Sequence, residues 1–278
     1  MSANKQVTSF PMFKEKARHV RKSALESVIK TGKGHLGGAF SCVEILVSLY
    51  YSGFLRINPE DAENPDRDYF LMGKGHACIS LYPILFDRGF ISKSEFESYG
   101  QDGGKLGGQL DRGIPGVEYN TGSLGHVLGT SAGIAMSLLQ CKRENRAIAL
   151  VGDAELEEGA MWEAIYFAAK HRLSNLVCVI DRNKLSVTRD IDNHEIFQSF
   201  SDKISLMGWH CFEINGHSFD ELISVLKEIE RADKPTMVVA HTIKGKGVSF
   251  MENEIKWHHS VPNAEEVLLA KVELGFDR

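Results

Sequence analysis

The chain repeats two patterns of hydrophobic and polar residues, short apolar runs and longer amphipathic stretches. The short runs predict strands at residues 68–72, 147–153, 175–181, 209–214 and 236–241. The amphipathic stretches predict helices at residues 12–30, 41–53, 76–88, 125–141, 157–172 and 218–231. Because strands and helices alternate, we expect an α/β fold whose mostly parallel sheet is covered by helices on both faces.

Length, composition and charge indicate the number of domains, the classes of partner and the cellular compartment to expect. The 278 residues contain no linker rich in Pro, Ser or Gly and no repeat, so we expect a single domain over residues 1–278. The net charge of −5 gives no reason to expect nucleic acid or an anionic membrane as partner. The sequence has no apolar run of about 18 residues, so we expect no transmembrane helix. The polar N-terminus lacks a signal-peptide core. The five cysteines are widely spaced without a CxxC motif, which is typical of reduced thiols in a cytoplasmic protein.

Asp153 and Asn183 each follow a predicted buried strand, and an amphipathic stretch lies between those strands. Strand, helix and strand at this spacing form a βαβ unit with parallel strands. Both side chains then lie at the carboxyl edge of the sheet, where α/β proteins bind ligands. A carboxylate and an amide oxygen suit a hard cation such as Mg²⁺, with phosphate oxygens completing its shell. The alternative is structural, with Asp153 capping a turn and Asn183 lying in a loop.

Five glycine-rich segments accompany this pair, and several carry a histidine. They are TGKGHLGG (31–38), MGKGHA (72–77), GGKLGGQLD (103–111), NTGSLGHVLG (120–129) and IKGKGVSF (243–250). Glycine permits sharp turns and lets backbone amides approach a ligand, and a glycine-rich turn that leads into a helix can bind an anion. Turns alone do not account for five such segments.

Over essentially its full length the chain resembles the N-terminal half of transketolase, a thiamin diphosphate enzyme. It is most similar to the small subunit of split transketolases, whose two halves are separate polypeptides. The segments that carry the resemblance occur in the family's order: TGKGHLGG, LMGKGHA, YNTGSLGH, VGDAELEEGAMWEA, VIDRNKLSV and IKGKGVSFMENEIKWHH.

The resemblance implies a site for thiamin diphosphate and Mg²⁺. Asp153 and Asn183 match the family's metal ligands, with the backbone carbonyl of Leu185 as the third protein ligand. The other positions that match cofactor-binding residues are His76, Gly122, Ser123, Leu124, Gly152, Ala154, Lys244 and His258. A divalent cation, a lysine and helix N-termini together offset the charge of a diphosphate.

The resemblance also implies catalytic residues. His35 matches a substrate-contacting histidine, and His76 and His258 match positions near the reacting centre. Glu158 matches a glutamate in a carboxylate network that links the two cofactor sites of the assembly. Imidazoles supply the proton donors and acceptors that carbanion chemistry on a sugar needs near neutral pH.

The other histidines are interpreted differently. For His126, the alternative is that the backbone of its loop, and not its side chain, is the functional part. His259 is interpreted as incidental. Four further histidines have no motif around them and are interpreted as structural: His171, His194, His210 and His217.

Three positions depart from the family's pattern. Ala154 stands where the family usually has the last glycine of GDG, so a methyl group could crowd the diphosphate. Gln109 replaces a histidine that touches cofactor and substrate, which keeps hydrogen-bonding capacity but loses the titratable proton. Val127 stands where a glycine is frequent. Gln109 therefore leaves the identity of the sugar open.

In the family, the glutamate that activates the cofactor lies in the C-terminal half, as do the residues that hold the substrate's phosphate. This chain has roughly half the length of the fused enzyme. We expect it to be inactive alone and to need a C-terminal transketolase subunit, in an assembly of two copies of each. The expected reaction transfers a two-carbon ketol unit from a ketose phosphate to an aldose phosphate.

Four alternatives remain. One is a transketolase-like subunit for an unusual sugar, such as a branched or sulfonated ketose, which Gln109 favours. Another is a 2-oxo acid dehydrogenase subunit or a deoxyxylulose phosphate synthase, although these lack the ordered glycine-rich segments. A third is a non-catalytic relic that binds phosphates or a partner, which the intact Asp153 and Asn183 disfavour. The fourth is a dinucleotide-binding domain, which the absence of GxGxxG after a first strand disfavours.

Overall fold

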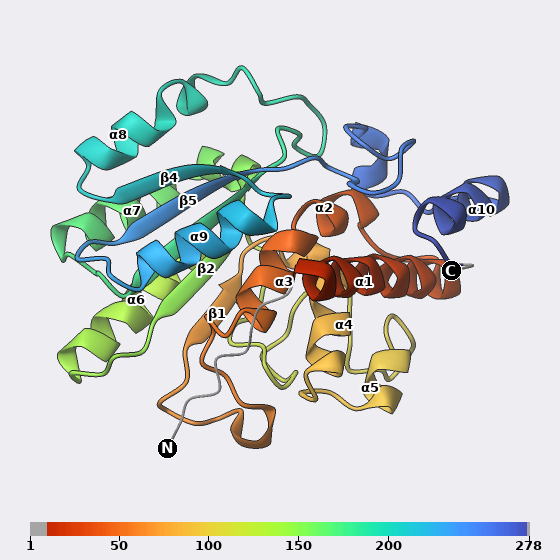
Figure 1. The fold of residues 1–278 in the computed structure, drawn as a ribbon, viewed down its shortest axis with the longest axis horizontal. Coiled ribbons are helices and arrows are strands. Elements are labelled where there is room, and N and C mark those ends of the chain that lie inside the picture. The colour runs from red at the N-terminus through yellow and green to blue at the C-terminus, as the bar shows by residue number, and fades with distance from the viewer. Residues whose placement is uncertain (1–9, 277–278) are drawn as a thin grey trace.

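The computed structural model describes residues 10–276 and contains a five-stranded sheet. Its strands are β1 (Tyr69–Met72), β2 (Ala147–Gly152), β3 (Leu176–Arg182), β4 (His210–Asn215) and β5 (Thr236–His241). The strand order is β1-β2-β3-β5-β4, and every neighbouring pair is parallel. All five predicted strands are present within two residues of their predicted bounds, which confirms the expected fold class (Figure 1).

Ten α-helices connect and cover the strands in the described part of the chain. They are α1 (Phe10–Thr31), α2 (Leu36–Ser41), α3 (Val43–Tyr51), α4 (Cys78–Asp87), α5 (Lys93–Glu97), α6 (Val127–Gln140), α7 (Gly159–Lys170), α8 (Phe200–Leu206), α9 (Phe219–Ile229) and α10 (Ala264–Glu273). Short 3₁₀ turns lie at Pro59–Asp61, Gly75–Ala77, Asp153–Glu157, Glu195–Phe197 and Ile255–His258. None of the described helices is both long enough and apolar enough to cross a membrane.

The predicted helices are all present, but four helices were not predicted. α2, α5 and α8 have only five to seven residues, which is too short for a helical period to show in the sequence. α10 has ten residues, and several of its apolar side chains face solvent, so no clear polar face marks it. The predicted helix at 41–53 is shorter than expected, because Cys42 separates α2 from α3.

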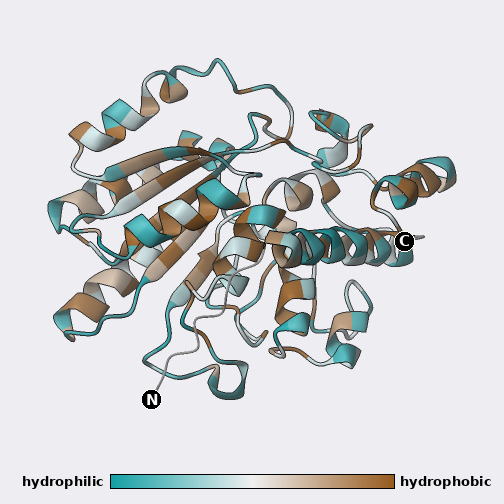
Figure 2. Ribbon diagram, in the orientation of Figure 1, coloured by the Kyte–Doolittle hydropathy of each residue, from teal (hydrophilic) through white to brown (hydrophobic). Residues whose placement is uncertain are grey.

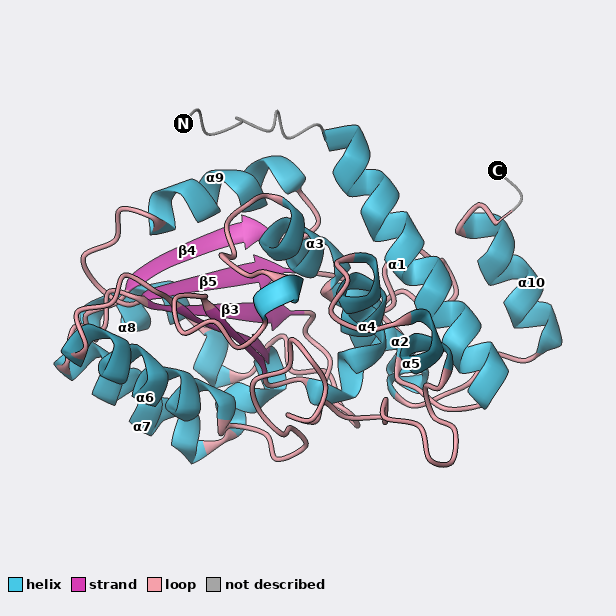
Figure 3. Cartoon of the chain, turned by 90° about the horizontal axis from the view of Figure 1, so that it is seen from below, coloured by secondary structure: helices cyan, strands magenta, loops and turns pink. Residues whose placement is uncertain are grey.

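The two faces of the sheet carry separate hydrophobic clusters. Alternate residues of β2 point to opposite sides, so that Ile148 packs with α1, α3, α4 and α9 while Ala149 packs with α6, α7 and α8. Every residue of β3 is buried, which is typical of a central parallel strand. Helices therefore cover both faces, as Figure 3 shows for α9 on one side and α6 and α7 on the other. The central strands are mostly hydrophobic (Figure 2).

The loop after β5 returns to the start of the chain. Gly245 has a φ of +78°, and its backbone N–H donates to the Gly37 carbonyl at 2.9 Å. A Cβ at Gly245 would collide with the carbonyl group of Met251. The loop that carries Lys244 therefore needs glycine here, both for the left-handed backbone and for the close approach.

We predict that Gly245→Ala destabilises the protein far more than Gly103→Ala. Gly103 has a similar φ of +75° but has no atom within 4 Å of an added Cβ. Both variants lose about 1–2 kcal/mol from the left-handed backbone, and Gly245→Ala loses roughly a further 1–3 kcal/mol from the overlap. Urea unfolding measures both; equal losses would show that the Met251 contact is unimportant.

Candidate functional site

A cavity of about 230 Å³ opens at the carboxyl edge of the sheet. The predicted site residues that line it are His35, His76, Gly122, Leu124, Gly152, Asp153, Ala154, Asn183, Leu185, Lys244 and His258. Its other lining residues are Gly38, Lys74, Gln109, Glu155, Ser186 and Val187. Two predicted site residues, Ser123 and Glu158, are exposed and do not line the cavity. The fold thus brings together most of the residues that the sequence predicts, from four glycine-rich segments, two strand ends and the turn that carries His258.

Asp153 and Asn183 lie at the ends of neighbouring strands and are both buried. The backbone N–H of Lys184 donates to Asp153 Oδ2 at 2.5 Å, and this bond holds the turn after β3 against the end of β2. The side-chain oxygen of Asn183 accepts a bond from the backbone N–H of Leu185 at 3.3 Å. Carboxylate, amide and carbonyl oxygens are the ligands that a hard cation takes.

The Asp153 carboxylate carries more negative charge than its surroundings offset. Burial, followed by the nearby charge of Asp181, raises its pKa to about 6. Arg182 Nη1 approaches it only to 3.3 Å, and Arg182 also binds Asp192. A bound cation would supply the missing positive charge.

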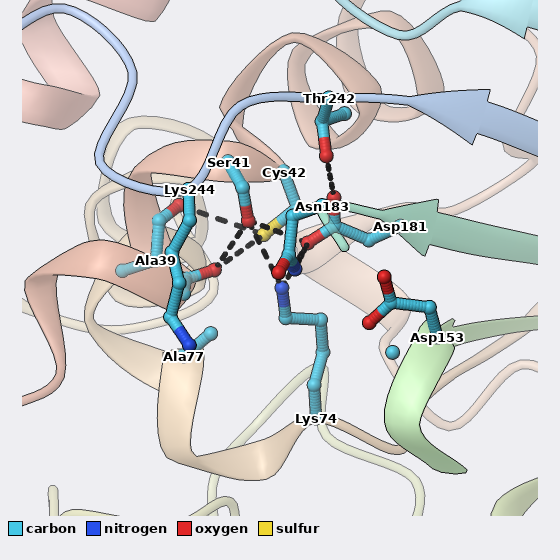
Figure 4. A network of polar contacts seen from close by, with 12 residues as sticks. Ala39, Ser41, Cys42, Lys74, Ala77, Asp153, Asp181, Asn183, Thr242 and Lys244 are labelled. Carbon is cyan, nitrogen blue, oxygen red and sulfur yellow. Dashed lines mark hydrogen bonds and ion pairs between the residues drawn. The ribbon is translucent and has the colours of Figure 1, made fainter. Parts of the chain in front are cut away.

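Asp181 is held in a different way, in a buried network that joins four segments. Its carboxylate accepts bonds from Lys74, from Thr242 and from Ser41 Oγ, the last at 2.5 Å. Asn183 Nδ2 donates to the same carboxylate at 3.3 Å. Figure 4 shows the Asp153 carboxylate beside this network but not joined to it.

Lys74 and Asp181 form a buried ion pair in which each residue stabilises the charge of the other. Burial alone would raise the pKa of Asp181, but Lys74 holds it below its ordinary value. Burial would likewise lower the pKa of Lys74, yet Asp181 keeps it raised. Neither residue is among those that the sequence predicts for the site. The available signals were a lysine inside the MGKGHA segment and an aspartate as the last buried position of a strand.

Lys244 stands where a cation is expected. Its ammonium group donates to the carbonyl oxygens of Leu185 at 3.1 Å and Ser186 at 3.0 Å. Burial and then the charge of Lys74 lower its pKa to about 8. The Leu185 carbonyl oxygen thus already accepts a bond from a positive group. Together with the Asp153 carboxylate and the Asn183 amide oxygen, it forms an oxygen donor set that fits Mg²⁺ with a diphosphate. Among residues 10–276 no cluster of three His, Cys, Asp or Glu side chains suits a metal.

Four histidine rings gather on the other side of Lys244. The ring centre of His35 lies 5.3 Å from that of His76, 5.5 Å from that of His258 and 4.7 Å from that of His259. The interpretation of His259 as incidental stays a prediction, although its ring lies beside that of a predicted site residue.

The three predicted histidines are neutral at physiological pH. Burial is the largest cause in each case, and it lowers the pKa of His35 to about 4 and that of His258 to about 3. The pKa of His76 also lies well below its ordinary value. Lys244 donates to His258 Nδ1 at 3.1 Å, so the proton of neutral His258 is on Nε2.

Glu155, rather than Glu158, is the glutamate beside the cavity. Its carboxylate accepts bonds from the backbone N–H groups of Gly125 at 3.1 Å and Gly152 at 2.9 Å. Burial raises its pKa. Glu155 thus joins the TGSLGH loop to the end of β2, whereas Glu158 precedes α7 without a side-chain capping bond and is exposed. The sequence signal was its place within VGDAELEEG, where three glutamates compete.

Two of the three residues that depart from the family's pattern line the cavity. Gln109 lines it, and its Oε1 accepts a bond from Thr121 Oγ1 at 3.5 Å. Ala154 also lines it, and its backbone N–H donates to Asp153 Oδ1 at 2.9 Å. Val127 is buried at the start of α6 and packs in the hydrophobic cluster.

The remaining histidines lie away from the cavity lining. His217 accepts a bond from the backbone N–H of Ile243 and binds Glu44, so it fixes the segment just before Lys244. His171, His194 and His210 have local partners: the Phe167 ring, the backbone N–H of Ile196 and Asp233. His126 is exposed, with its ring bound to the carbonyl group of Leu124.

We predict opposite stability effects for Asp153→Asn and Asp181→Asn in the metal-free chain. The folded-state pKa of Asp153 is raised from 3.8, so its ionisation costs stability as pH rises towards 6. Asp153→Asn should therefore stabilise the chain by on the order of 2 kcal/mol at pH 7, with no difference below about pH 4.

Asp181→Asn should destabilise the chain by about 3–5 kcal/mol at pH 7, because it leaves Lys74 buried without its partner. Urea unfolding in the presence of a chelator, at a series of pH values, measures both variants. Destabilisation by Asp153→Asn at pH 7 would mean that the buried carboxylate is already fully compensated.

Comparison with known proteins agrees with the geometry. The family model "Transketolase, thiamine diphosphate binding domain" matches residues 13–278. The chain is 38% identical over 247 residues to an apulose-4-phosphate transketolase subunit of Phocaeicola vulgatus, covering 88% of each chain. It is 34% identical over 258 residues to a 6-deoxy-6-sulfo-D-fructose transketolase subunit of Clostridium sp., covering 92% of this chain and 93% of that one.

A solved structure gives the same result for the fold. The transketolase of Campylobacter jejuni superimposes with a TM-score of 0.91 at 27% sequence identity. The match covers 96% of this chain and 43% of the Campylobacter chain, so this protein spans less than half the length of that relative.

Proposed function

We propose that this chain, which belongs to the transketolase family, is the cofactor-binding subunit of a two-component transketolase. Its reaction would transfer a two-carbon ketol unit from a ketose to an aldose, together with a C-terminal subunit. Two relatives that are themselves named as subunits, and that match over most of their lengths, support this assignment. The observation that carries it is the set of oxygen donors at the sheet edge beside a cluster of neutral histidines.

The residues at the sheet edge would hold the diphosphate and its metal. Asp153, Asn183 and the Leu185 carbonyl supply oxygen ligands for Mg²⁺, and Lys244 is the adjacent cation for phosphate oxygens. The TGSLGH loop and His76 line the same cavity. Thiamin diphosphate supplies the carbanion chemistry when it is bound.

The histidine cluster would form hydrogen bonds with the hydroxyl groups of the sugar. Because His35, His76 and His258 are neutral, each has one nitrogen that donates and one that accepts a hydrogen bond. His258 presents Nε2–H, since Nδ1 accepts from Lys244. Efficient proton transfer needs a pKa near the working pH, whereas the pKa values of His35 and His258 lie far below it. These neutral imidazoles therefore suit hydrogen bonding to sugar hydroxyl groups.

A partner subunit would complete the site. Of the described residues that line the cavity, only Asp153 and Glu155 are carboxylates. Asp153 belongs to the metal set, and two backbone amides hold Glu155. The acid that activates the cofactor in the family would therefore come from the C-terminal subunit, in an assembly of two copies of each. The exposed position of Glu158 suits a role at that interface.

The sugar is proposed to be an unusual ketose, either branched or sulfonated. Gln109 faces the cavity at the position where the family has a histidine that touches substrate. The two relatives described above are named for apulose 4-phosphate and for a sulfonated fructose. These observations favour an unusual sugar over the ketose phosphates of the common enzyme.

We predict that the chain mixed with its partner binds thiamin diphosphate only when Mg²⁺ is present. Asp153→Ala should weaken binding roughly 100-fold or more, since a metal ligand matters more than the outer-shell residues that cost 10–100-fold. Asp202→Ala is the matched control, because it removes an exposed carboxylate from α8, away from the cavity lining. Calorimetric titration measures all three proteins. Binding that survives chelation, or none at all in the wild-type mixture, would contradict the site; binding without turnover of any ketose would favour a non-catalytic relic.

We predict that Gln109→His shifts sugar preference towards xylulose 5-phosphate. A changed polar contact in the cavity should alter the ratio of kcat/KM between xylulose 5-phosphate and the preferred branched or sulfonated ketose roughly tenfold or more. Parallel assays with each donor measure the ratio. A wild-type enzyme that strongly prefers xylulose 5-phosphate would contradict the proposed sugar class.

A further inference from the structure

His259 carries an imidazole at the site that none of the roles above uses. Its ring centre lies 4.7 Å from that of His35, with the planes tilted by 55°. The side chain is exposed, and its ring has no hydrogen bond or ion pair to any other residue of the described chain, 10–276. His35 lines the cavity whereas His259 does not, so His259 stands at the rim beyond His35.

The position of His259 is fixed by the packing of the residues before it. The Trp257 ring is buried, and its Nε1–H donates to the Phe250 carbonyl at 2.9 Å. The Trp257 carbonyl oxygen lies so near Gly37 that a Cβ there would approach it to 2.7 Å. The turn Ile255–His258 is therefore packed against α2, the helix that His35 precedes. Binding residues need such rigid support.

His35 also has unused hydrogen-bonding capacity. Its Nδ1 is buried without a partner among residues 10–276, so the ring nitrogen that a sugar can reach is Nε2. Two adjacent imidazoles at the rim, each with one donor and one acceptor when neutral, match the neighbouring hydroxyl groups of a sugar. A contact with the diphosphate is disfavoured, because Lys244 binds His258 rather than His259, and His259 does not reach the cavity lining.

We propose that His259 determines sugar specificity by contacting a hydroxyl group of the ketose beside His35. The inference rests on the proposed function, since it assigns a further residue to the same substrate.

The test compares His259→Ala and His259→Gln with His171→Ala, each purified with the partner subunit. His171 is the matched control, because it is an exposed imidazole that packs on another ring, Phe167, at 4.4 Å between ring centres. The donors are xylulose 5-phosphate, apulose 4-phosphate and 6-deoxy-6-sulfofructose. His259→Ala should raise KM for the preferred donor roughly three- to tenfold, the loss of one neutral hydrogen bond. His259→Gln keeps a donor and an acceptor and should recover most of the loss, and His171→Ala should change nothing.

Thiamin diphosphate affinity, measured in parallel, should be the same in all the proteins. An unchanged KM in His259→Ala would overturn the inference, as would a matching loss of cofactor affinity, because His259 would then act on the cofactor. If the wild-type mixture binds no cofactor and uses no donor, the proposed function fails and this inference fails with it. Wild-type turnover with unaltered variants would overturn this inference alone.

Discussion

The buried ion pair between Lys74 and Asp181 is the interaction on which the site depends. It links the loop after β1 to β3, and Ser41 and Thr242 tie α2 and the end of β5 to the same carboxylate. Taking two charges out of water is costly, and the pair persists because the carboxylate is fully hydrogen-bonded. Its consequence is positional, since the segments that carry His35, His76, Asn183 and Lys244 all adjoin it in sequence.

This pair also explains why Asp153 is available to a ligand. Lys74 is committed to Asp181, so the buried Asp153 retains charge that its neighbours do not offset, and burial raises its pKa. The raised pKa of Asp153, with the Asn183 amide and the Leu185 carbonyl beside it, indicates a place for a divalent cation. Because the uncompensated Asp153 costs stability in the metal-free chain, binding of a cation there should raise the free energy of unfolding.

The sequence predicted the fold well because the strands are buried on both faces, which leaves continuous apolar runs such as AIALV. It predicted most of the cavity because five glycine-rich segments and two polar strand ends occur together in one chain, which turns alone do not account for. It did not assign Lys74 and Asp181 to the site, since a buried pair depends on side chains 107 positions apart that only the sheet brings together. It did not single out Glu155 as a residue that lines the cavity, because burial, which separates Glu155 from Glu158, cannot be read from three glutamates in four positions. His259 was set aside because its contact with His35 depends on how the Trp257 turn packs on α2.

We propose that this chain holds thiamin diphosphate and needs a second chain to activate it. The most direct test is made at the cofactor. The measurement is the rate at which the C2 proton of thiamin diphosphate exchanges with deuterium, followed by NMR, for the chain alone and with its partner subunit. We predict exchange no faster than in free solution for the chain alone and much faster exchange in the mixture. Fast exchange in the chain alone would show that it carries its own activating acid and would contradict the two-component account.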